Sequence, residues 1–571
     1  MDQNRKRRVL FVGEASFLAT GFSTYWNEVI QRLYATGEFS IAEMGSYAHA
    51  DDPRCQQVPW KFYPVAPARS DAAAMAIYDP RVNPTHQFGE GCFDDVCLDF
   101  KPDIVLAIRD WWMDEFILRS PLRKNFSLVW MPTIDGEPQR ELWLDSYKQC
   151  DRILTYSQYG LDLLKKTGRP GTELVTIAAP GVDLDTFKPP DDKREHKAKL
   201  GIDPNSLIVG TVMRNQKRKL YYDLIEAFSQ WLYRSKSKGH TELAKRTFLY
   251  LHTSYPDVGY DIGKAVQDFK VGNKVIMTYL CANCQTAYPA FFSGDVMVCR
   301  KCGQLAAHPP NAGHSCPRNV LADIMKTFDL YVQYSISEGF GMPCVDAIAC
   351  GIPLAAVDYS AMQDHLRCPT SLPISVGRFF WEAIIETEQR RALPSNADFV
   401  NKMDRFLRLS EDTRNEKSLQ TRAYAEELVN TYGSDQKMPR YSWDRTAAIW
   451  GQVIRETEIN DPESTWLCKT SRVLKPNLVP PSNNMNNNEF VNWVIGKVWN
   501  RPDMLDTHFA KNWLQDLNSG SRTAGDKRVP FGRQEFVNHF VGMIQAANAI
   551  EEKRLAMLQG TEAKQISVTV I

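Results

Sequence analysis

The stretch SISEGFGMPCVDAIACGIPLAAVDYSAMQDH, residues 335–365, decides the fold. It follows an apolar run, residues 329–334, that predicts a buried strand. The chain then turns at Gly339 and continues as a helix that ends at Gly351. Residues 353–357 predict the next strand. Strand, glycine turn, helix and strand form a βαβ unit, whose ligand site lies at the carboxyl end of the first strand.

The glycine turn suits an anion. Glycines let the backbone approach a ligand closely, and free amides at the start of a helix favour phosphate. Two acids, Glu338 and Asp346, stand eight positions apart and bracket the turn. Carboxylates accept hydrogen bonds from hydroxyls, so the pair suits a sugar or a ribose. Their spacing is equally compatible with a helix cap and a solvated acid of the first turn, so both interpretations stay open.

The run EGFGMPCVDAIACGIPLAAVD, residues 338–358, resembles the acid-x7-acid signature of the retaining glycosyltransferases of family 4. That family has the GT-B fold, an α/β architecture of two Rossmann-like domains that face a cleft. The resemblance implies that Glu338 holds the transferred sugar and Asp346 the ribose of a nucleotide-sugar. It assigns the donor diphosphate to the glycine turn, residues Gly339, Phe340, Gly341 and Met342. Asp346 stands where the family usually has Glu, which leaves the choice between a UDP- and a GDP-sugar open.

Composition narrows the class of protein. A chain of 571 residues has room for two substantial domains and additions. Its formal net charge of zero provides no global basic field for nucleic acid. Without an uncharged apolar run of about 18 residues we expect no membrane span, and Glu14 interrupts the apolar run at the start, which favours a strand over a signal peptide. Thirteen cysteines, an odd number that includes two CxxC pairs, suit the reducing cytoplasm better than a secreted disulfide framework. For a viral protein this would be the cytoplasm of the host.

We expect residues 1–190 to form the acceptor-side domain. Gly21 precedes its first helix, where the family's glycine loop approaches the donor phosphates. Residues 41–100 have an irregular pattern, and the strand at 127–131 is followed by the turn PTIDGEP. The family places a catalytic or acceptor-side His or Asp in that turn, and Asp135 occupies it here. Asp135-Gly136 is equally compatible with a plain turn dipeptide.

Residues 191–425 are expected to form the donor-binding domain, with helices between His365 and Gly433. Arg214 and Lys219, five positions apart, follow its first strand. The resemblance implies that they clamp the donor diphosphate, and Arg218 could substitute for either. Fixed cations there would stabilise the charge that develops on the leaving group.

The last parts of the chain are predicted to be helical. Residues 426–460 resemble the family's closing helices, which cross back to the first domain. Residues 461–571 form a helical extension without a counterpart in the family. Its apolar stripe, which includes Phe536 and Phe540, either packs on the catalytic body or makes a homodimer contact.

Four cysteines in the expected insertion, residues 279–312, form two CxxC pairs separated by fourteen residues: Cys281, Cys284, Cys299 and Cys302. Two such hairpins bring four thiolates together around zinc. The alternative is a set of spare buried thiols. A closed four-thiolate site has no open position for chemistry, so we expect a structural zinc ribbon or a docking surface.

The predicted function is transfer of a sugar from a nucleotide-sugar to an acceptor hydroxyl, with retained anomeric configuration. Glu338, Asp135, Arg214 and Lys219 are its predicted catalytic residues. The zinc ribbon and the extension resemble viral relatives that glycosylate hydroxymethylated bases in DNA. A cell-surface glycan is the alternative acceptor. Two other classes stay open: a sugar-nucleotide epimerase, which needs no acceptor, and a non-catalytic binding module.

Overall fold

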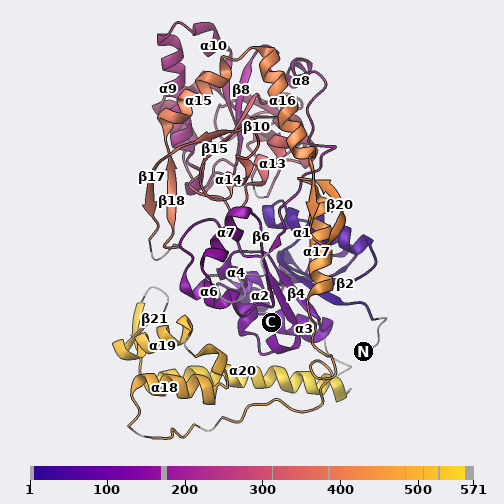
Figure 1. The fold of residues 1–571 in the computed structure, drawn as a ribbon, viewed down its shortest axis with the longest axis vertical. Coiled ribbons are helices and arrows are strands. Elements are labelled where there is room, and N and C mark those ends of the chain that lie inside the picture. Colours follow the sequence, from indigo (N-terminus) through magenta and orange to yellow (C-terminus); the bar gives the residue numbers. More distant parts are fainter. Residues whose placement is uncertain are drawn as a thin grey trace.

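The computed structural model describes residues 5–168, 176–311, 313–383, 386–476, 478–482, 484–505, 507–524 and 527–559. Two α/β units lie end to end along the long axis of the molecule (Figure 1). A third unit, mainly helical, lies beneath the first of them. The described helices include none that is both long and apolar enough to cross a bilayer.

The first unit is built on a seven-stranded parallel sheet. Its strand order is β3-β2-β1-β4-β5-β6-β7. The strands are β1 (Arg8–Glu14), β2 (Ser40–His49), β3 (Lys61–Ala66), β4 (Ile104–Ala107), β5 (Ser127–Trp130), β6 (Arg152–Thr155) and β7 (Thr176–Ile177). Val12, Ala107 and Trp130 are paired side by side near the carboxyl ends of three central strands. The loops that follow these strands therefore emerge at one edge.

Helices cover both faces of this sheet, which explains why its central strands β1, β4 and β5 are almost entirely buried and mainly apolar. They are α1 (Gly21–Ala35), α2 (Ala72–Tyr78), α3 (Phe93–Phe100), α4 (Trp111–Asp114), α5 (Phe116–Arg119), α6 (Glu141–Tyr147) and α7 (Gln158–Lys166), with short turns η1 (Pro53–Gln56), η2 (His86–Phe88) and η3 (Arg123–Asn125). The irregular stretch 41–100 contains strands β2 and β3. Glu43 and Ser46, both buried inside β2, interrupt its apolar pattern.

The second unit has a nine-stranded sheet of order β12-β13-β10-β9-β8-β14-β15-β16, with β11 also paired to β10. Its strands are β8 (Leu207–Val212), β9 (Thr247–His252), β10 (Val275–Cys281), β11 (Ala287–Phe291), β12 (Met297–Val298), β13 (Leu305–His308), β14 (Leu330–Gln333), β15 (Leu354–Val357) and β16 (Leu372–Ile374). The strands from β10 to β16 by way of β9, β8, β14 and β15 are parallel. Strands β11, β12 and β13 belong to the cysteine-rich insertion and pair antiparallel.

The helices of the second unit are α8 (Lys193–Lys199), α9 (Tyr221–Ser237), α10 (Thr241–Arg246), α11 (Ile262–Asp268), α12 (Arg318–Met325), α13 (Met342–Ala349), α14 (Met362–His365), α15 (Asn396–Leu407) and α16 (Glu411–Glu426), with turns η4 (Lys217–Lys219) and η5 (Gly272–Lys274). The stretch that decided the fold therefore forms β14, the glycine turn, α13 and β15, as predicted.

The segment after His365 was expected to be helical throughout, and this expectation is wrong in part. It contains β16 and an antiparallel hairpin, β17 (Val376–Trp381) with β18 (Arg390–Pro394). Aromatic residues favour an extended conformation there. The hairpin reaches toward the first unit (Figure 1), where the backbone amide of Arg390 donates a hydrogen bond to the Glu137 carbonyl at 2.8 Å.

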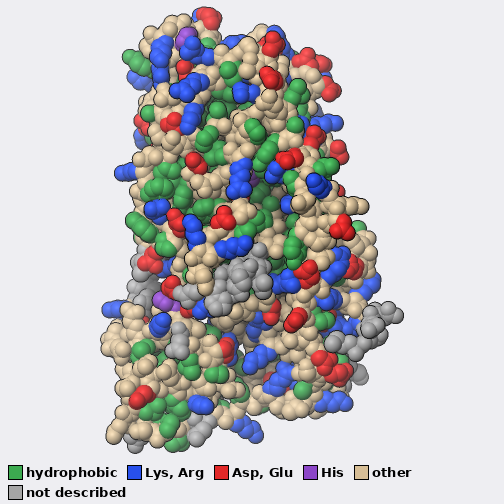
Figure 2. Space-filling view, viewed as in Figure 1, with side chains coloured by type: hydrophobic (Ala, Val, Ile, Leu, Met, Phe, Trp, Pro, Cys, Tyr) green, Lys and Arg blue, Asp and Glu red, His purple; other side chains and the backbone are tan. Residues whose placement is uncertain are grey.

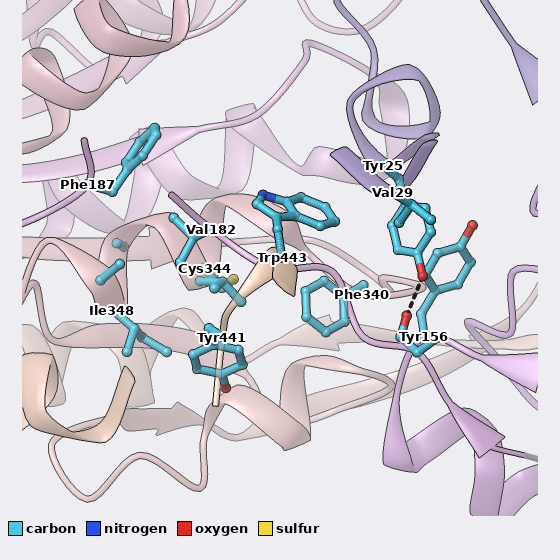
Figure 3. Packing of buried hydrophobic residues seen from close by; sticks show 14 of the residues in the cluster. Tyr25, Val29, Tyr156, Val182, Phe187, Phe340, Cys344, Ile348, Tyr441 and Trp443 are labelled. Atoms are coloured by element: carbon cyan, nitrogen blue, oxygen red, sulfur yellow. Dashed lines mark hydrogen bonds between the residues drawn. The ribbon is translucent and has the colours of Figure 1, made fainter. Parts of the chain in front are cut away.

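The chain then returns to the first unit. Residues 426–460 hold a second hairpin, β19 (Leu428–Thr431) with β20 (Ser434–Pro439), and one long helix, α17 (Trp443–Glu456), where we expected helices alone. Trp450 of α17 donates a hydrogen bond from Nε1 to Tyr25 Oη of α1 at 2.7 Å. Trp443 and Tyr25 share a buried cluster with Phe340 of the glycine turn (Figure 3). Helix α17 therefore joins the two units through a common core.

The extension contains α18 (Asn487–Trp493), a π-helical turn η6 (Val494–Val498), η7 (Pro502–Met504), α19 (His508–Ser519), a hairpin of β21 (Ser521–Ala524) and β22 (Lys527–Pro530), and α20 (Arg533–Gln559). Phe536 and Phe540 of the predicted stripe pack in the extension's own aromatic core. Ile550, further along α20, packs against the first unit. The described part of the stripe is thus used within the chain.

Candidate active site

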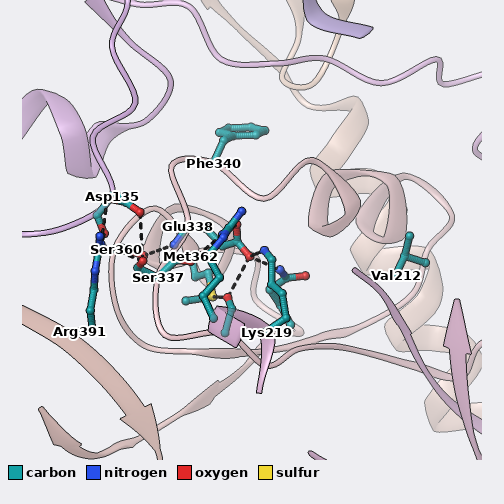
Figure 4. Close-up of polar contacts among 12 residues, drawn as sticks. Asp135, Val212, Lys219, Ser337, Glu338, Phe340, Ser360, Met362 and Arg391 are labelled. Carbon is teal, nitrogen blue, oxygen red and sulfur yellow. Dashed lines mark hydrogen bonds and ion pairs between the residues drawn. The ribbon is translucent and has the colours of Figure 1, made fainter. Parts of the chain in front are cut away.

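The site lies where loops from the two units meet. The loop after β14 carries Ser337 and Glu338, and the loop after β5 carries Asp135. Figure 4 shows Asp135 and Arg391 on one side of the loop after β14 and Lys219 on the other, with Glu338 between them. Because β5 and β14 end at facing edges of their sheets, residues about 200 positions apart in the sequence come within hydrogen-bond distance.

Glu338 is the centre of a buried network. One carboxylate oxygen accepts hydrogen bonds from Lys219 Nζ, Gln333 Nε2 and Ser335 Oγ, the last at 2.9 Å. Arg218 Nη1 reaches the other oxygen at 3.1 Å. Burial by itself would raise the pKa of Glu338, but Lys219 and Arg218 outweigh it and lower the pKa to about 2. The carboxylate is therefore ionised at neutral pH.

Lys219 is as deeply buried as its partner. The side chains of Lys219 and Glu338 are 8% and 7% exposed. Burial and the nearby Arg218 lower the pKa of Lys219 to about 8, against the opposing effect of Glu338. The ammonium therefore keeps its proton at neutral pH. A fixed positive charge beside a carboxylate at the end of β14 is suited to an anionic leaving group.

The predicted Arg214–Lys219 pair is separated in this structure. Arg214 is half exposed and forms a two-point ion pair with Asp257, at 2.8 and 3.0 Å. Arg218 takes the place beside Lys219, at Glu338. The basic turn η4 therefore presents Arg218 and Lys219 together to the site.

The glycine turn is held by contacts with the first unit. A Cβ atom on Gly339 would lie 2.5 Å from Thr133 Cγ2, so any larger residue there would force Thr133 or the turn to move. Gly341 has a φ of +88°, the left-handed region that glycine favours. A Cβ atom on Gly21 would lie 3.9 Å from Met342 Sδ. The loop that carries Gly21 therefore faces the turn from the other unit.

Asp346, about one turn into α13, has an ion-pair partner. Arg318 at the start of α12 binds it at two points, 2.9 and 2.8 Å. The Asp346 side chain is 2% exposed, whereas that of Arg318 is 42% exposed and lies over the Phe187 ring. Any hydroxyl that reaches Asp346 also meets the Arg318 guanidinium, which the sequence analysis did not foresee.

Asp135 belongs to the first unit and contacts two residues of the second. It forms an ion pair with Arg391 Nη1 at 2.9 Å and accepts a hydrogen bond from Ser337 Oγ at 3.1 Å. Arg391 in turn binds Glu382 at 2.9 Å. Sequence reasoning missed Arg391 because it treated the hairpin β17–β18 as helical. An aromatic, extended pattern in residues 376–381 was the available signal.

Asp110, after β4, is a further acid of this site that the sequence analysis left unassigned. Burial and the nearby Asp135 raise its pKa to about 6, although Thr133 and Arg218 favour its ionised form. Asp110, Asp135 and Arg218 thus influence one another electrostatically. The position of Asp110 follows from the strand order, because β4 and β5 are neighbours in the sheet.

The four cysteines of the insertion lie together. Their sulfur atoms are all within 4.8 Å of one another, with Cys281 and Cys302 3.6 Å apart and Cys284 and Cys299 3.7 Å apart. A tetrahedral zinc with bonds of about 2.3 Å places its sulfur ligands roughly 3.8 Å apart. The thiols therefore fit that geometry. Cys281 ends β10, Cys284 lies in the turn between β10 and β11, and the other two cysteines lie between β12 and β13.

Comparison with known proteins identifies the class of fold. Residues 313–367, which include Glu338 and Asp346, match the family model described as glycosyl transferases group 1. A D-inositol 3-phosphate glycosyltransferase of Rhodococcus erythropolis is 26% identical over 34% of this chain and 35% of its own length. The corresponding protein of Streptomyces bingchenggensis is 26% identical over 38% and 40%. The chain thus spans well under half the length of these curated relatives.

Solved structures extend the likeness to most of the fold. Sucrose-phosphate synthase from Thermosynechococcus elongatus has a TM-score of 0.52 at 15% identity and covers 79% of this chain and 99% of its own. HepE of Anabaena in complex with UDP-glucose has a TM-score of 0.52 at 14% identity, covering 78% and 99%. The chain therefore has a GT-B-like α/β fold, as the sequence predicted.

Proposed function

We propose that this protein is a retaining glycosyltransferase that moves a sugar from a nucleotide-sugar to an acceptor hydroxyl. The observation that carries the proposal is the buried set of Glu338, Lys219 and Arg218 at the end of β14, facing Asp135 of the other unit. HepE was solved with UDP-glucose, which supports a UDP-sugar over a GDP-sugar as donor. Residues 1–190 would supply the acceptor side, and residues 191–425 would bind the donor.

In the proposed reaction the bond between the sugar C1 and the diphosphate oxygen breaks, and the diphosphate leaves with the bonding electrons. Lys219 and Arg218 stabilise its charge, and Arg214 joins them after leaving Asp257. The acceptor oxygen attacks C1 from the same face, and its proton passes to the departing diphosphate oxygen. Glu338 holds the sugar hydroxyls, while Asp346 binds the ribose together with Arg318.

The amides of the glycine turn from Gly339 to Met342, and the loop of Gly21, would contact the diphosphate. We assign Asp135 to the acceptor side, where it orients the attacking hydroxyl. Asp110 stands beside it as a second carboxylate that can accept a hydrogen bond. In this proposal, residues of the chain act on both sides of the bond between the sugar C1 and the diphosphate oxygen, and the reaction uses no metal ion.

We also propose that Cys281, Cys284, Cys299 and Cys302 hold a structural zinc. When bound, zinc would fix the two loops of the insertion against β10. The metal would thus stabilise a segment that is too short to form a hydrophobic core by itself. None of the thirteen cysteines, all of which lie in the described part of the chain, forms a disulfide, which supports a reducing compartment, and we place the protein in the cytoplasm.

The acceptor has two candidates from the sequence, a hydroxymethylated base in DNA and a cell-surface glycan. Lys, Arg, Asp and Glu side chains are interspersed over the face shown in Figure 2, without a basic stripe. Association through the extension would give a homodimer, and it would leave the site unchanged.

The test is nucleotide release from a panel of UDP- and GDP-sugars, with and without hydroxymethylated DNA or glycans. We expect release that Glu338→Gln abolishes and that an acceptor accelerates. An epimerase would interconvert the donors without an acceptor and release no nucleotide. A binding module would release nothing and would bind its partner equally well after Glu338→Gln. Either result would refute the transferase.

A further inference from the structure

A groove of about 780 Å³ lies between the two units on the side of α7 and the β17–β18 hairpin. This volume is within the range of roughly 300–1,000 Å³ that is usual for ligand sites. Its walls come from both units: Glu137 and Tyr159 from the first, and Tyr359 and Phe379 from the second. None of these residues belongs to the donor-side network of Glu338 and Lys219.

One wall of the groove is aromatic. The ring centroids of Tyr159 and Tyr359 are 6.0 Å apart, and those of Tyr359 and Phe379 are 5.5 Å apart. Phe379 is 43% exposed, so part of its ring is open to a ligand in the groove. Arg390 covers one face of its ring at 4.3 Å. Aromatic faces of this kind pack against the apolar faces of sugar rings as well as against nucleic-acid bases.

The charges of the groove distinguish these two kinds of ligand. The lining has four acids (Glu137, Asp162, Asp358, Asp364) and four bases (Lys165, Lys166, Arg367, Arg390), so its formal charge is zero. A nucleic-acid groove needs an excess of cations, because phosphate neutralisation supplies much of its affinity. Hydroxyls, in contrast, need both acceptors and donors, which carboxylates, amides and guanidinium groups provide. The balance therefore favours a neutral, hydroxyl-rich ligand.

The groove also opens beside the proposed active site. Glu137 lines it and lies two residues after Asp135 on the same loop. Tyr359 lines it and precedes Ser360, whose Oγ accepts a hydrogen bond from the Glu338 amide at 2.9 Å. A chain that occupied the groove would therefore lead toward the loops that carry Asp135 and Glu338.

We propose that this groove binds the acceptor and that the acceptor is a neutral oligosaccharide chain. The inference rests on the proposed transferase function and deepens it by naming the class of acceptor. In this arrangement a sugar ring lies against Phe379, which the buried Tyr359 supports from behind, and the sugar hydroxyls bind the charged lining. The terminal hydroxyl reaches Asp135.

The first experiment measures binding of neutral probes, maltoheptaose, laminarihexaose and chitohexaose, to the full chain by saturation-transfer NMR and calorimetry. We expect at least one to bind, with an affinity that does not change between about 50 and 200 mM salt. Phe379→Leu keeps apolar volume in the hairpin but removes the ring face. We expect it to weaken binding roughly fivefold to tenfold.

The matched control is Trp381→Leu. Trp381 lies on the same strand, is 64% exposed and is outside the groove lining. Its replacement is expected to change oligosaccharide affinity less than about twofold. Equal weakening by the two variants would overturn the proposal, because it would show a general effect of the hairpin.

Absence of binding to every neutral probe would also overturn it. So would binding of hydroxymethylated DNA that falls steeply with salt and depends on Phe379, since that result assigns the groove to nucleic acid. Donor hydrolysis, measured in parallel with Glu338→Gln as the inactive reference, tests the transferase itself. Its absence together with Phe379-dependent oligosaccharide binding would refute the proposed function while the groove remained a glycan site.

Discussion

Replacing Lys219 with Met tests whether the Lys219–Glu338 pair is a buried charge pair on which the site depends. Met retains much of the side-chain volume but leaves the Glu338 carboxylate, 7% exposed, without its nearest cation. A pKa of about 2 for Glu338, against an ordinary 4.5, corresponds to about 3 kcal/mol of stabilisation of the ionised form. Breaking one side of a buried pair costs roughly 3–5 kcal/mol. Arg218 still reaches Glu338, so we expect the lower value, about 3 kcal/mol.

The pH dependence of Lys219→Met should have the opposite sign to that of the native protein. In the native protein the pKa of Glu338 is lowered, so its stabilising effect is present above pH 4.5 and is lost as the pH falls toward 2. Without Lys219, burial favours the protonated form of Glu338, and only Arg218, whose side chain is 43% exposed, opposes it. The variant should therefore become more stable, relative to its own value at pH 7, as Glu338 takes up its proton.

Hydrogen exchange of the β8 and β14 amides is the appropriate assay, because it reports on opening of the donor-binding unit rather than of the whole chain. A loss of about 3 kcal/mol corresponds to roughly 100-fold faster exchange. Lys217→Met is the control, since Lys217 lies on the same turn but is 88% exposed, and we expect no more than about 0.5 kcal/mol. Adding Glu338→Gln to Lys219→Met should recover much of the stability, because the buried carboxylate is then replaced by a neutral amide, and the side chain of Arg218, which loses its partner, is 43% exposed.

Transferase activity should fall by roughly 100-fold to 1,000-fold in Lys219→Met, because a preorganised charge at the leaving group is lost. The double variant should remain as inactive although it is stable. The reasoning is wrong if Lys219→Met exchanges like the native protein, or if the double variant is no more stable than the single one.

Three further changes test other parts of the site. Cys284→Ser should release zinc, as measured by metal content, and should lower the melting temperature, whereas Cys316→Ser, outside the cluster, should retain the metal; no zinc in the native protein would contradict the assignment. If ionised Asp110 supports transfer, activity should decline as the pH falls through about 6. Asp110→Asn should be slower than the native protein and should lack this decline. A pH profile unchanged by the substitution would show that Asp110 has no part in transfer. Gly339→Ala places a Cβ 2.5 Å from Thr133 Cγ2, so it should raise the KM for donor at least about tenfold, and Thr133→Ser, which removes that methyl group, should restore part of the loss.

Sequence patterns predicted the parts of the molecule that local chemistry dictates. The apolar strand, glycine turn and helix around Glu338 form as expected, because turn geometry and helix start signals act within a few residues. The cysteine cluster was also predictable, since two short knuckles carry their own spacing. Strand β2 was missed because Glu43 and Ser46 are buried polar residues whose partners lie elsewhere in the chain.

The partners of each acid could not be predicted in the same way. That Asp346 binds Arg318, and Arg214 binds Asp257, depends on side chains that meet only after folding. The sequence analysis treated Arg214 and Lys219 as a pair because of their spacing. Spacing along a loop does not determine direction, and Arg218 is the residue that turns toward Glu338.

Two neighbouring residues, Ser337 and Glu338, take part in the networks on the two sides of the proposed active site. Ser337 belongs to the network of Asp135 and Arg391, on the acceptor side, while its neighbour Glu338 belongs to that of Lys219 and Arg218. Successive residues of an extended segment point to opposite sides, so the neighbours Ser337 and Glu338 can serve different networks. Separation of the two units would break the contact of Ser337 with Asp135 but leave Glu338 with its cations. The network of Glu338 with Lys219 and Arg218 therefore lies within one unit, whereas the contact of Ser337 with Asp135 needs both units. In the proposed reaction, a change at the contact between the units would disturb the acceptor side while Glu338 keeps its cations.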